Sequence, residues 1–354
     1  MAEETAAKRL KTSPPLIGTH NGHFHADEAL AVYLLRLLPT YNPSTLLRTR
    51  DPAILLTCHT VVDVGGEYSP AANRYDHHQR TFNTTFPSRS TKLSSAGLVY
   101  MHFGKAIIAQ QTKLAEESDQ VSILWEKIYA EFVEALDAHD NGISVYDPTD
   151  TANLRKRFYD GGISLGSLVG DLNFNPSDTP IDGEKPARSP QEEQAEEDGR
   201  FLEASSLMGT TFLRKLAYYH RAWLPARTVV HDAYDARKSH SAGGQIMVFD
   251  RSVPWKDHLY SLEASHPSEE RVAYVLYPEG PHEGAKWRIQ AVSVTKESFE
   301  SRKPLPEAWR GFRDEKLDEV SAIDGCVFVH ASGFIGGNKT FEGAMKMALR
   351  GLEM

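Results

Sequence analysis

The feature that most limits the fold of this chain is a short apolar segment, Leu16–Thr19, separated by a polar turn from a strongly apolar stretch, Ala26–Leu38. This pattern predicts a buried strand followed by a buried helix. Short β-like runs at Leu46–Arg48 and Thr60–Val64 follow. Strands that alternate with helices predict an α/β fold with a doubly wound, mainly parallel sheet. In such a sheet, functional groups gather at the carboxyl ends of the strands.

The length of 354 residues predicts two domains, because the chain is too long for one ordinary core. We expect a catalytic domain over residues 16–222, with helices at Ser94–Ile108 and Asp119–Ala138 and a third that ends near His220. A polar, disordered tail is expected over 1–15, and a solvated acidic loop over about 175–200, which runs into a helix start.

The remaining residues, 223–354, predict a second, smaller α/β domain that binds substrate, introduced by Pro225. Its polar linkers separate several apolar runs with the composition of strands. These runs are Thr228–Val230, Gln245–Phe249, Val272–Tyr277, Trp287–Val294 and Cys326–Val329, before a final helix at about Thr340–Leu349.

Composition and charge exclude several classes of protein. The net charge is −9, which disfavours a duplex-DNA binder but leaves room for a local basic groove. The only two cysteines, Cys58 and Cys326, are far apart, which argues for a reducing compartment. No apolar run predicts a membrane span, and the N-terminus lacks the apolar region of a secretory signal. Lys8–Lys11 is either a nuclear import patch or part of a solvated tail.

Histidines are concentrated in two short stretches. His20, His23 and His25 lie within a few residues of Asp27, and an Asp76-His77-His78 triplet follows later. Neutral imidazole and carboxylate are the usual ligands of divalent transition metals. The first stretch lies at the expected strand-to-helix junction, where ligands converge in α/β proteins. A metal-dependent hydrolase is therefore the first hypothesis.

Five residues form one candidate metal site because each lies near the end of an expected element or in the loop after it. They are His25, Asp27, Asp63, His77 and Asp140. Mixed nitrogen and oxygen ligands suit Mn, Fe, Co or Zn better than Ca, with Mg a weaker option. Two ions bridged by Asp63 would activate water for attack on phosphorus. Taken alone, Asp27 would be an ordinary favourable charge at a helix N-terminus. The metal-site hypothesis therefore depends on the clustering of all five residues.

The order His-x-Asp, Asp-x-Gly, Asp-His-His and a later Asp resembles the DHH phosphoesterase superfamily. Longer motifs narrow the resemblance to the MYG1 (UPF0160) family, over about residues 16–354. The motifs are Gly18-Thr-His-Asn-Gly-His-Phe-His-Ala-Asp-Glu28, Val61-Val-Asp-Val-Gly-Gly66, Tyr75-Asp-His-His-Gln79, Lys92-Leu-Ser-Ser-Ala-Gly97, Asp137-Ala-His-Asp-Asn-Gly142 and His330-Ala-Ser-Gly-Phe-Ile-Gly-Gly337.

The resemblance implies a role for each matching position in the first domain. The implied metal ligands are His25 and Asp27, then Asp63, then His77 with Asp76 beside it, then Asp140 or Asp137, with Asp140 preferred. His20 and His23 are either ligands or phosphate contacts. His78 either contacts the substrate phosphate or orients a ligand. Arg48 and Arg50 follow a strand and face either a phosphate or solvent.

In the second domain, four residues resemble the glycine-rich substrate motif of these enzymes, and Lys339 adds charge. The four are His330, Gly333, Gly336 and Gly337. Glycines let a backbone approach a phosphate, and exposed N–H groups cradle the anion. The alternative for the Gly336-Gly337 pair is an ordinary turn before the last helix. Either His78 or His330 would protonate the leaving oxygen.

The resemblance implies 3′→5′ exonucleolytic hydrolysis of single-stranded RNA, releasing nucleoside 5′-monophosphates in a cleft between the domains. It implies two divalent ions, with Mn first and Mg, Co or Zn as alternatives. Two other functions stay open: a phosphoesterase or pyrophosphatase for a small nucleotide or dinucleotide, and a non-catalytic RNA-binding metalloprotein. The resemblance also implies nuclear and mitochondrial pools, whereas the N-terminal sequence alone favours nucleus or cytoplasm. The oligomeric state is open, with a homodimer as one option.

Overall fold

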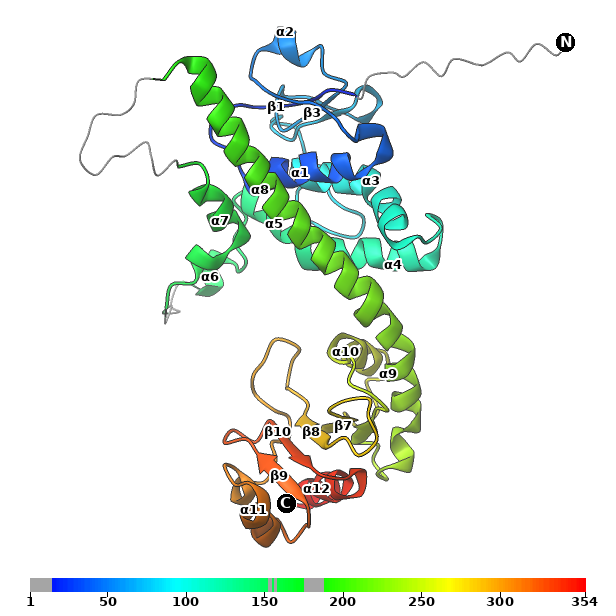
Figure 1. The fold of residues 1–354 in the computed structure, drawn as a ribbon. Coiled ribbons are helices and arrows are strands. Elements are labelled where there is room, and N and C mark those ends of the chain that lie inside the picture. The colour runs from blue at the N-terminus through cyan, green and yellow to red at the C-terminus, as the bar shows by residue number, and fades with distance from the viewer. Residues whose placement is uncertain (1–14, 152–154, 156–157, 175–187) are drawn as a thin grey trace, which may run out of the picture. The chain divides into compact units, whose positions relative to one another are not determined.

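The computed structural model describes residues 15–151, 155, 158–174 and 188–354 (Figure 1). The chain divides into two compact units, Met1–Tyr219 and His220–Met354, three residues before the expected boundary. The expected tail and its basic tetramer lie outside the described residues, apart from Pro15. So does the acidic segment up to residue 187. From Pro190 onward the acidic residues are helical, so the loop predicted over 190–200 is wrong.

The first unit is built on a five-stranded sheet of order β2-β1-β3-β5-β4. Its strands are β1 (Ile17–Thr19), β2 (Leu46–Arg48), β3 (Thr60–Val62), β4 (Tyr68–Ser69) and β5 (Arg74–Tyr75). All neighbouring pairs are parallel except β4–β5, which confirms the parallel-rich α/β fold. Because β2 and β3 lie on opposite sides of β1, the order in which strands are added to the sheet reverses at β1. Open sheets bind ligands at the carboxyl ends beside such a switch point.

Helix α1 (Ala26–Leu37) is the centre of the first unit, between the sheet and the helices α3 (Ser95–Thr112) and α8 (Pro190–Tyr218) (Figure 1). Its apolar residues are buried on all sides, as expected for a helix surrounded by other elements. Gly209 of α8 allows close approach, because a Cβ there would lie 2.0 Å from the Tyr33 ring. The short α2 (Pro52–Leu55) lies on the opposite face of the sheet, over Cys58 and Val61.

The predicted helix over Asp119–Ala138 exists, but a π-helical turn interrupts it. Helix α4 (Asp119–Ile128) is followed by the turn η3 (Tyr129–Val133) and by α5 (Glu134–Asp140), which ends at Asn141 as expected. Turns of this kind often occur near functional sites. The smaller elements of the unit are η1 (Pro39–Tyr41), η2 (Pro70–Ala72), α6 (Pro148–Thr151), η4 (Gly161–Ile163) and α7 (Leu165–Asp171).

The second unit holds a mixed sheet of order β6-β7-β8-β10-β9. Its strands are β6 (Ile246–Val248), β7 (Tyr274–Pro278), β8 (Trp287–Ala291), β9 (Cys326–Val329) and β10 (Ile335–Asn338). Only β6–β7 is parallel. The helical elements are η6 (Tyr219–Trp223), which begins one residue before the unit boundary, α9 (Leu224–Ala236), η7 (Arg237–Ser239), α10 (Lys256–Ser265), η8 (Glu307–Trp309), α11 (Asp314–Ser321) and α12 (Phe341–Glu353).

Two predictions about the second unit need correction. The strand expected at Thr228–Val230 is wrong, because these residues lie inside α9, which buries Ala226, Val230 and Ala233 at helical spacing. Pro225 does not end a helix there, because it lies inside α9, directly after the π-helical turn η6. The Gly336-Gly337 pair forms part of strand β10, so the turn expected as the alternative is also wrong.

Two further findings bear on the environment of the chain. Cys58 and Cys326 are both buried free thiols. Over the residues that the structure describes, no helix is long and apolar enough to span a bilayer.

Candidate metal centre

Three neighbouring parallel strands of the first unit each end in a residue predicted to bind metal. His20 follows β1, Asp63 follows β3, and Asp76 follows β5. Helix α1 adds Asp27 and Glu28 from its first turn, because it begins soon after β1. All of these residues except Glu28 line one cavity of about 740 Å³ in the first unit. The order of the strands therefore brings together residues that are far apart in the sequence.

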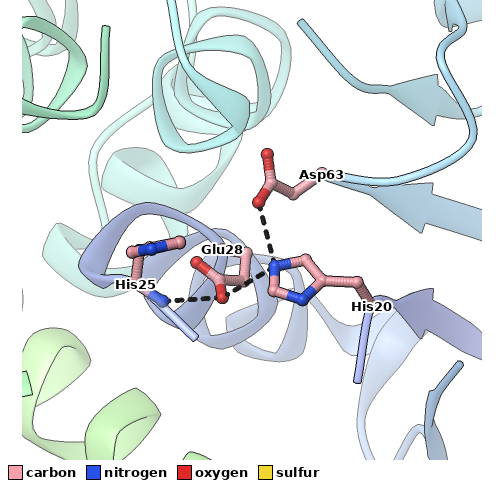
Figure 2. A group of neighbouring side chains, drawn as sticks. All are labelled: His20, His25, Glu28 and Asp63. Carbon is pink, nitrogen blue, oxygen red and sulfur yellow. Dashed lines mark hydrogen bonds and ion pairs between the residues drawn. The ribbon is translucent and has the colours of Figure 1, made fainter. Parts of the chain in front are cut away.

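The first group of potential ligands consists of His20, His25, Glu28 and Asp63, whose donor atoms lie within 4.8 Å of one another (Figure 2). His20 Nε2 lies 3.2 Å from Glu28 Oε1 and 3.3 Å from Asp63 Oδ2. The backbone N–H of His25 donates to Glu28 Oε1 at 2.8 Å. Sequence reasoning missed Glu28. The signal that would have found it is a second acidic residue beside Asp27 in an otherwise apolar helix.

Two further groups complete the centre. One joins Asp63 to the triplet Asp76, His77 and His78, and the other joins His25 to Asp27 and Asp140. Asp63 is thus a member of two groups, on either side of its carboxylate. His77 links them as well, since its Nδ1 is 3.5 Å from Asp63 Oδ1. Its Nε2 is 2.9 Å from Asp140 Oδ2.

Three carboxyl groups in this centre are buried side by side. Burial raises the pKa of Asp63 well above its ordinary value, and the charge of Asp27 raises it further. Burial, followed by the charge of Asp140, also raises the pKa of Asp27. The pKa of Glu28 rises in the same way, first through burial and then through Asp27. Such acids are costly to ionise together unless a cation lies between them.

The buried atoms that lack a partner test whether the site fits a metal. Among the described residues, Asp27 Oδ1, Glu28 Oε2, Asp63 Oδ1 and His77 Nδ1 are buried and make no hydrogen bond. Buried polar atoms are nearly always hydrogen-bonded, so four exceptions in one place need an explanation. Carboxylate oxygen and imidazole nitrogen are ligand types for Mn, Co, Zn and related ions. The residues therefore fit divalent cations.

Asp76 and His78 form a pair at the edge of the cavity. His78 Nδ1 lies 2.7 Å from Asp76 Oδ1, and this hydrogen bond raises the pKa of His78. Burial by itself would raise the pKa of Asp76, but hydrogen bonds from His78 and from the Gly66 N–H lower it overall. The His78 side chain is 60% exposed. Asp76 thus fixes the orientation of a histidine that a substrate can reach.

Asp63 also has an unusual backbone conformation. Its φ is +57°, in the left-handed region, and Gly65 and Gly66 follow with positive φ values. A residue other than glycine in this region is strained, although Asp and Asn tolerate it best. Strain of this kind is concentrated at functional sites.

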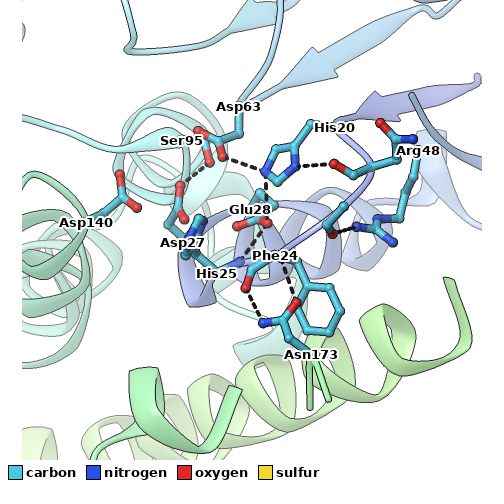
Figure 3. Close-up of polar contacts among 12 residues, drawn as sticks. His20, Phe24, His25, Asp27, Glu28, Arg48, Asp63, Ser95, Asp140 and Asn173 are labelled. Carbon is cyan, nitrogen blue, oxygen red and sulfur yellow. Dashed lines mark hydrogen bonds and ion pairs between the residues drawn. The ribbon is translucent and has the colours of Figure 1, made fainter. Parts of the chain in front are cut away.

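The turn between β1 and α1 is anchored from outside the centre. The Gly22 N–H donates to Glu197 Oε1 at 2.7 Å, and Arg48 Nη2 donates to the Gly22 carbonyl at 2.7 Å. The Asn173 side chain accepts from the Phe24 N–H and donates to its carbonyl (Figure 3). Arg48 is buried, with its guanidinium paired to Glu197. Neither of the two roles expected for Arg48 applies.

Asp137, the alternative to Asp140 for the fourth ligand, lies in a different environment. Its Oδ1 accepts from the Ser94 N–H, the Ser94 hydroxyl and the Gly97 N–H, and its Oδ2 accepts from Tyr129. Burial raises the pKa of Asp137 to about 7. Its two oxygens are fully engaged, and no ligand group among the described residues includes it. The structure places Asp140, and not Asp137, in the centre.

Two other predicted residues of the first unit line the cavity. They are Arg50, which is exposed, and His23, whose ring lies edge-on to Phe174. Figure 3 shows Asp27 within the centre, where Ser95 donates to its Oδ2 at 2.7 Å. Ser95 is a second residue that sequence reasoning missed.

The predicted substrate residues of the second unit differ in exposure. His330 and Lys339 are exposed, and His330 Nδ1 contacts the Ser332 hydroxyl at 2.9 Å. Gly333 is buried, with φ at +73°. Gly336 and Gly337 lie inside β10, which has β8 and β9 on its two sides. Backbone groups of such a strand are used in sheet pairing, so they do not form the exposed cradle that was expected.

The fold and the centre together define an α/β protein with a carboxylate- and histidine-lined site that fits divalent cations. The family described as "Uncharacterised protein family (UPF0160)", MYG1_exonuc, matches residues 16–352. The chain is 46% identical to the MYG1 exonuclease of Bos taurus over 343 residues, which cover 95% of this chain and 84% of that protein. The MYG1 exonuclease of Homo sapiens is 45% identical over 343 residues, which cover 95% of this chain and 85% of that protein. The chain belongs to the MYG1 family.

Two other comparisons give one strong likeness and one weak one. A MYG1 protein of Schizosaccharomyces pombe is 45% identical over 343 residues, which cover 95% of this chain and 97% of that protein. A solved structure, "Crystal structure of exonuclease RecJ bound to manganese", covers 96% of this chain and 91% of that chain at 10% identity and a TM-score of 0.23. This likeness is too low to support an argument. The resemblance to the MYG1 family seen in the sequence is confirmed.

Proposed function

We propose that this protein is a divalent-metal-dependent exonuclease with a DHH-type catalytic domain. It hydrolyses single-stranded RNA from the 3′ end and releases nucleoside 5′-monophosphates. One observation carries the proposal: buried ligand atoms without partners meet at Asp63, where two ligand groups join. The family supports the choice of reaction, because its mammalian relatives are named MYG1 exonuclease. The proposed places of action are the nucleus and the mitochondrion, from the family resemblance.

Two of the three ligand groups share Asp63, and we propose two cation positions in this centre. We assign His77 and Asp76 to the position that includes Asp63. His25, Asp27 and Asp140, a group without Asp63, would form the other. His20 and Glu28 complete the surroundings of Asp63. Two ions are proposed, with Mn first and Mg, Co or Zn as alternatives. Bound divalent cations would supply activated water and neutralise charge on the phosphate.

The chain itself supplies the remaining chemistry. Asp76 engages Nδ1 of His78, which leaves Nε2 of this exposed ring to protonate the leaving oxygen. Arg50, on the cavity wall, presents a guanidinium to a phosphate. His330 and Lys339 are proposed as further substrate contacts because they are exposed.

The test uses metal-stripped full-length protein and single-stranded RNA labelled at one end or the other. With Mn²⁺ added, RNA labelled at the 5′ end should shorten progressively, whereas RNA labelled at the 3′ end should lose its label at once as a mononucleotide. Asp63→Asn should abolish both results. Asp250→Asn is the matched control, because Asp250 is an exposed acid of the second unit.

Other outcomes identify the alternative functions. Hydrolysis of a dinucleotide or of pyrophosphate, without shortening of RNA, would indicate a small-molecule phosphoesterase. RNA binding without hydrolysis under Mn²⁺, Mg²⁺, Co²⁺ or Zn²⁺ would indicate a non-catalytic metalloprotein. Either result refutes the exonuclease proposal.

A further inference from the structure

The sheet of the second unit carries one row of side chains across five extended segments. In register, Tyr277 of β7 pairs with Arg288 of β8, which pairs with Gly337 of β10. Gly337 also pairs with Phe328 of β9, and Phe328 is bridged to Arg313. Residues directly opposite in antiparallel strands point to the same face. We call these five residues the cross-strand row. Aromatic and cationic side chains alternate along it, with a gap at the glycine.

The gap at Gly337 has a clear structural reason. A Cβ there would lie 2.6 Å from Arg288 Nη1, so the glycine leaves space for the Arg288 side chain. The guanidinium crosses this space and lies 4.8 Å from the centre of the Phe328 ring. Arg313, the residue paired with Phe328, lies 5.7 Å from the centre of the same ring. Arg288 Nη2 pairs with Glu279, and Arg288 Nη1 is buried without a hydrogen-bond partner among the described residues.

One end of the row belongs to the core and the other is open. The sequence neighbours Leu276 and Ile289 are buried against α12 on the opposite face of the sheet. On the face of the row, α9 and α10 cover β6 and β7, and Tyr277 packs against that cluster. Phe328 is only partly buried and Arg313 is exposed. Beyond β7, therefore, the row presents the exposed Arg313 guanidinium, the partly buried Phe328 ring and the Arg288 side chain, which is 21% exposed.

We propose that the cross-strand row is a platform for single-stranded RNA. A base stacks on the planar surface formed by Phe328 and Arg288, and Arg313 holds a neighbouring phosphate. Aromatic rings and guanidinium planes on an open sheet are a recurrent way to bind unpaired bases. The exposed guanidinium of Arg313 favours a polyanionic ligand at this place, although Glu279 pairs with Arg288 and the chain carries a net charge of −9. The choice of RNA rests on the proposed function.

The test measures binding in EDTA, so that it does not depend on hydrolysis. Fluorescence anisotropy of a labelled oligouridine follows binding to the full chain at several salt concentrations. Phe328→Leu should weaken binding about tenfold, with an unchanged salt dependence, because it removes stacking. Arg313→Gln should reduce the slope of log affinity against log salt by about 1, because it removes one phosphate contact. Arg251→Gln is the control, since it removes an exposed charge of the same unit.

Three results would overturn this inference: normal binding by both variants, an equal loss in Arg251→Gln, or no RNA binding by the parent protein. Thermal unfolding checks that each variant is folded. If Phe328→Leu does not fold, the exposed Arg313→Gln decides alone. RNA shortening with normal binding by both variants would refute the row and leave the exonuclease proposal intact. RNA binding that depends on the row, without any hydrolysis, would support the row and refute the exonuclease proposal.

Discussion

Asp137 and Asp140 lie three residues apart near the end of α5, yet Asp137 is fully buried and Asp140 is partly exposed at the metal centre. Asp137 has a pKa raised to about 7, and four hydrogen bonds occupy its oxygens. Asp140 faces the cluster around Asp63, where acids of raised pKa keep buried atoms without partners. Burial alone would raise the pKa of Asp140 as well, but the hydrogen bond with His77 and the charge of His77 lower it overall. A raised pKa therefore does not separate the structural carboxylate from the ligands. The position of Asp140 beside ligand atoms that lack hydrogen bonds does.

The largest effect should come from Asp63→Asn, which changes the residue that two of the three ligand groups share. We expect at least a hundredfold loss of RNA hydrolysis, on the order of the largest losses seen when partners of metal ligands are altered. Bound metal, measured by elemental analysis, should fall as well. In EDTA the variant should be as stable as the parent or more so, because one of several crowded acids is removed. If this variant bound as much metal as the parent protein, Asp63 would not be a metal ligand.

Asp137→Ala should have the next largest effect, on stability. It leaves the Ser94 and Gly97 N–H groups and the Tyr129 hydroxyl without their acceptor. We expect a loss of about 3 kcal/mol in the free energy of unfolding, measured with urea. Metal bound per folded molecule should stay at the parent level. A selective loss of metal without a loss of stability would place Asp137 among the ligands.

Asp137→Asn sharpens the comparison through pH. The pKa of Asp137 rises from 3.8 to about 7 on folding. Between these values the folded protein keeps a proton that the unfolded chain has lost, so stability falls as pH rises and levels off above pH 7. Asn carries no such proton. In EDTA, the stability of the variant relative to the parent should therefore increase with pH, by at most about 1.4 kcal/mol per pH unit. Parallel curves for the two proteins would contradict this assignment.

The smallest effect is expected from Arg50→Gln on the exposed wall of the cavity. An exposed charge contributes little, so KM for RNA should rise about two- to fivefold while kcat changes little. Steady-state kinetics at two salt concentrations measure this effect, which should shrink at the higher one. Loss of kcat with unchanged KM would mean that Arg50 acts on the reaction itself.

Much of the first unit follows from local sequence patterns. The segments over β1, α1, β2 and β3 have apolar runs of the correct length, and their order places Asp63 and Asp76 at neighbouring strand ends. Asp140 was preferred to Asp137 as the fourth ligand, but the reason that excludes Asp137 did not follow from the sequence. It depends on the Ser94 turn and on Tyr129, which lie near Asp137 only in the folded chain. Glu28 was missed because an acid in the first turn of a helix usually serves only to stabilise the helix through its dipole.

The second unit was harder to predict for two physical reasons. The β-branched Val229 and Val230 favour strands, but burial at helical spacing outweighs that preference in α9. Glycines are poor strand formers, so the Gly336-Gly337 pair gave no strand signal. Gly337 is accommodated in β10 because the side chain of Arg288 uses the space above it. Such a reason is visible only once the strands are aligned.

The anchoring of the turn between β1 and α1 has a thermodynamic consequence. Arg48, Glu197 and Asn173 hold its backbone through bonds that involve no ligand atom of the centre. The backbone of the turn that carries His20 and His25 is therefore held by bonds that need no ion. Loading should then displace solvent without rearranging the chain, and calorimetry should record a heat-capacity change close to zero. A cage of fixed dimensions should also discriminate between ions by radius.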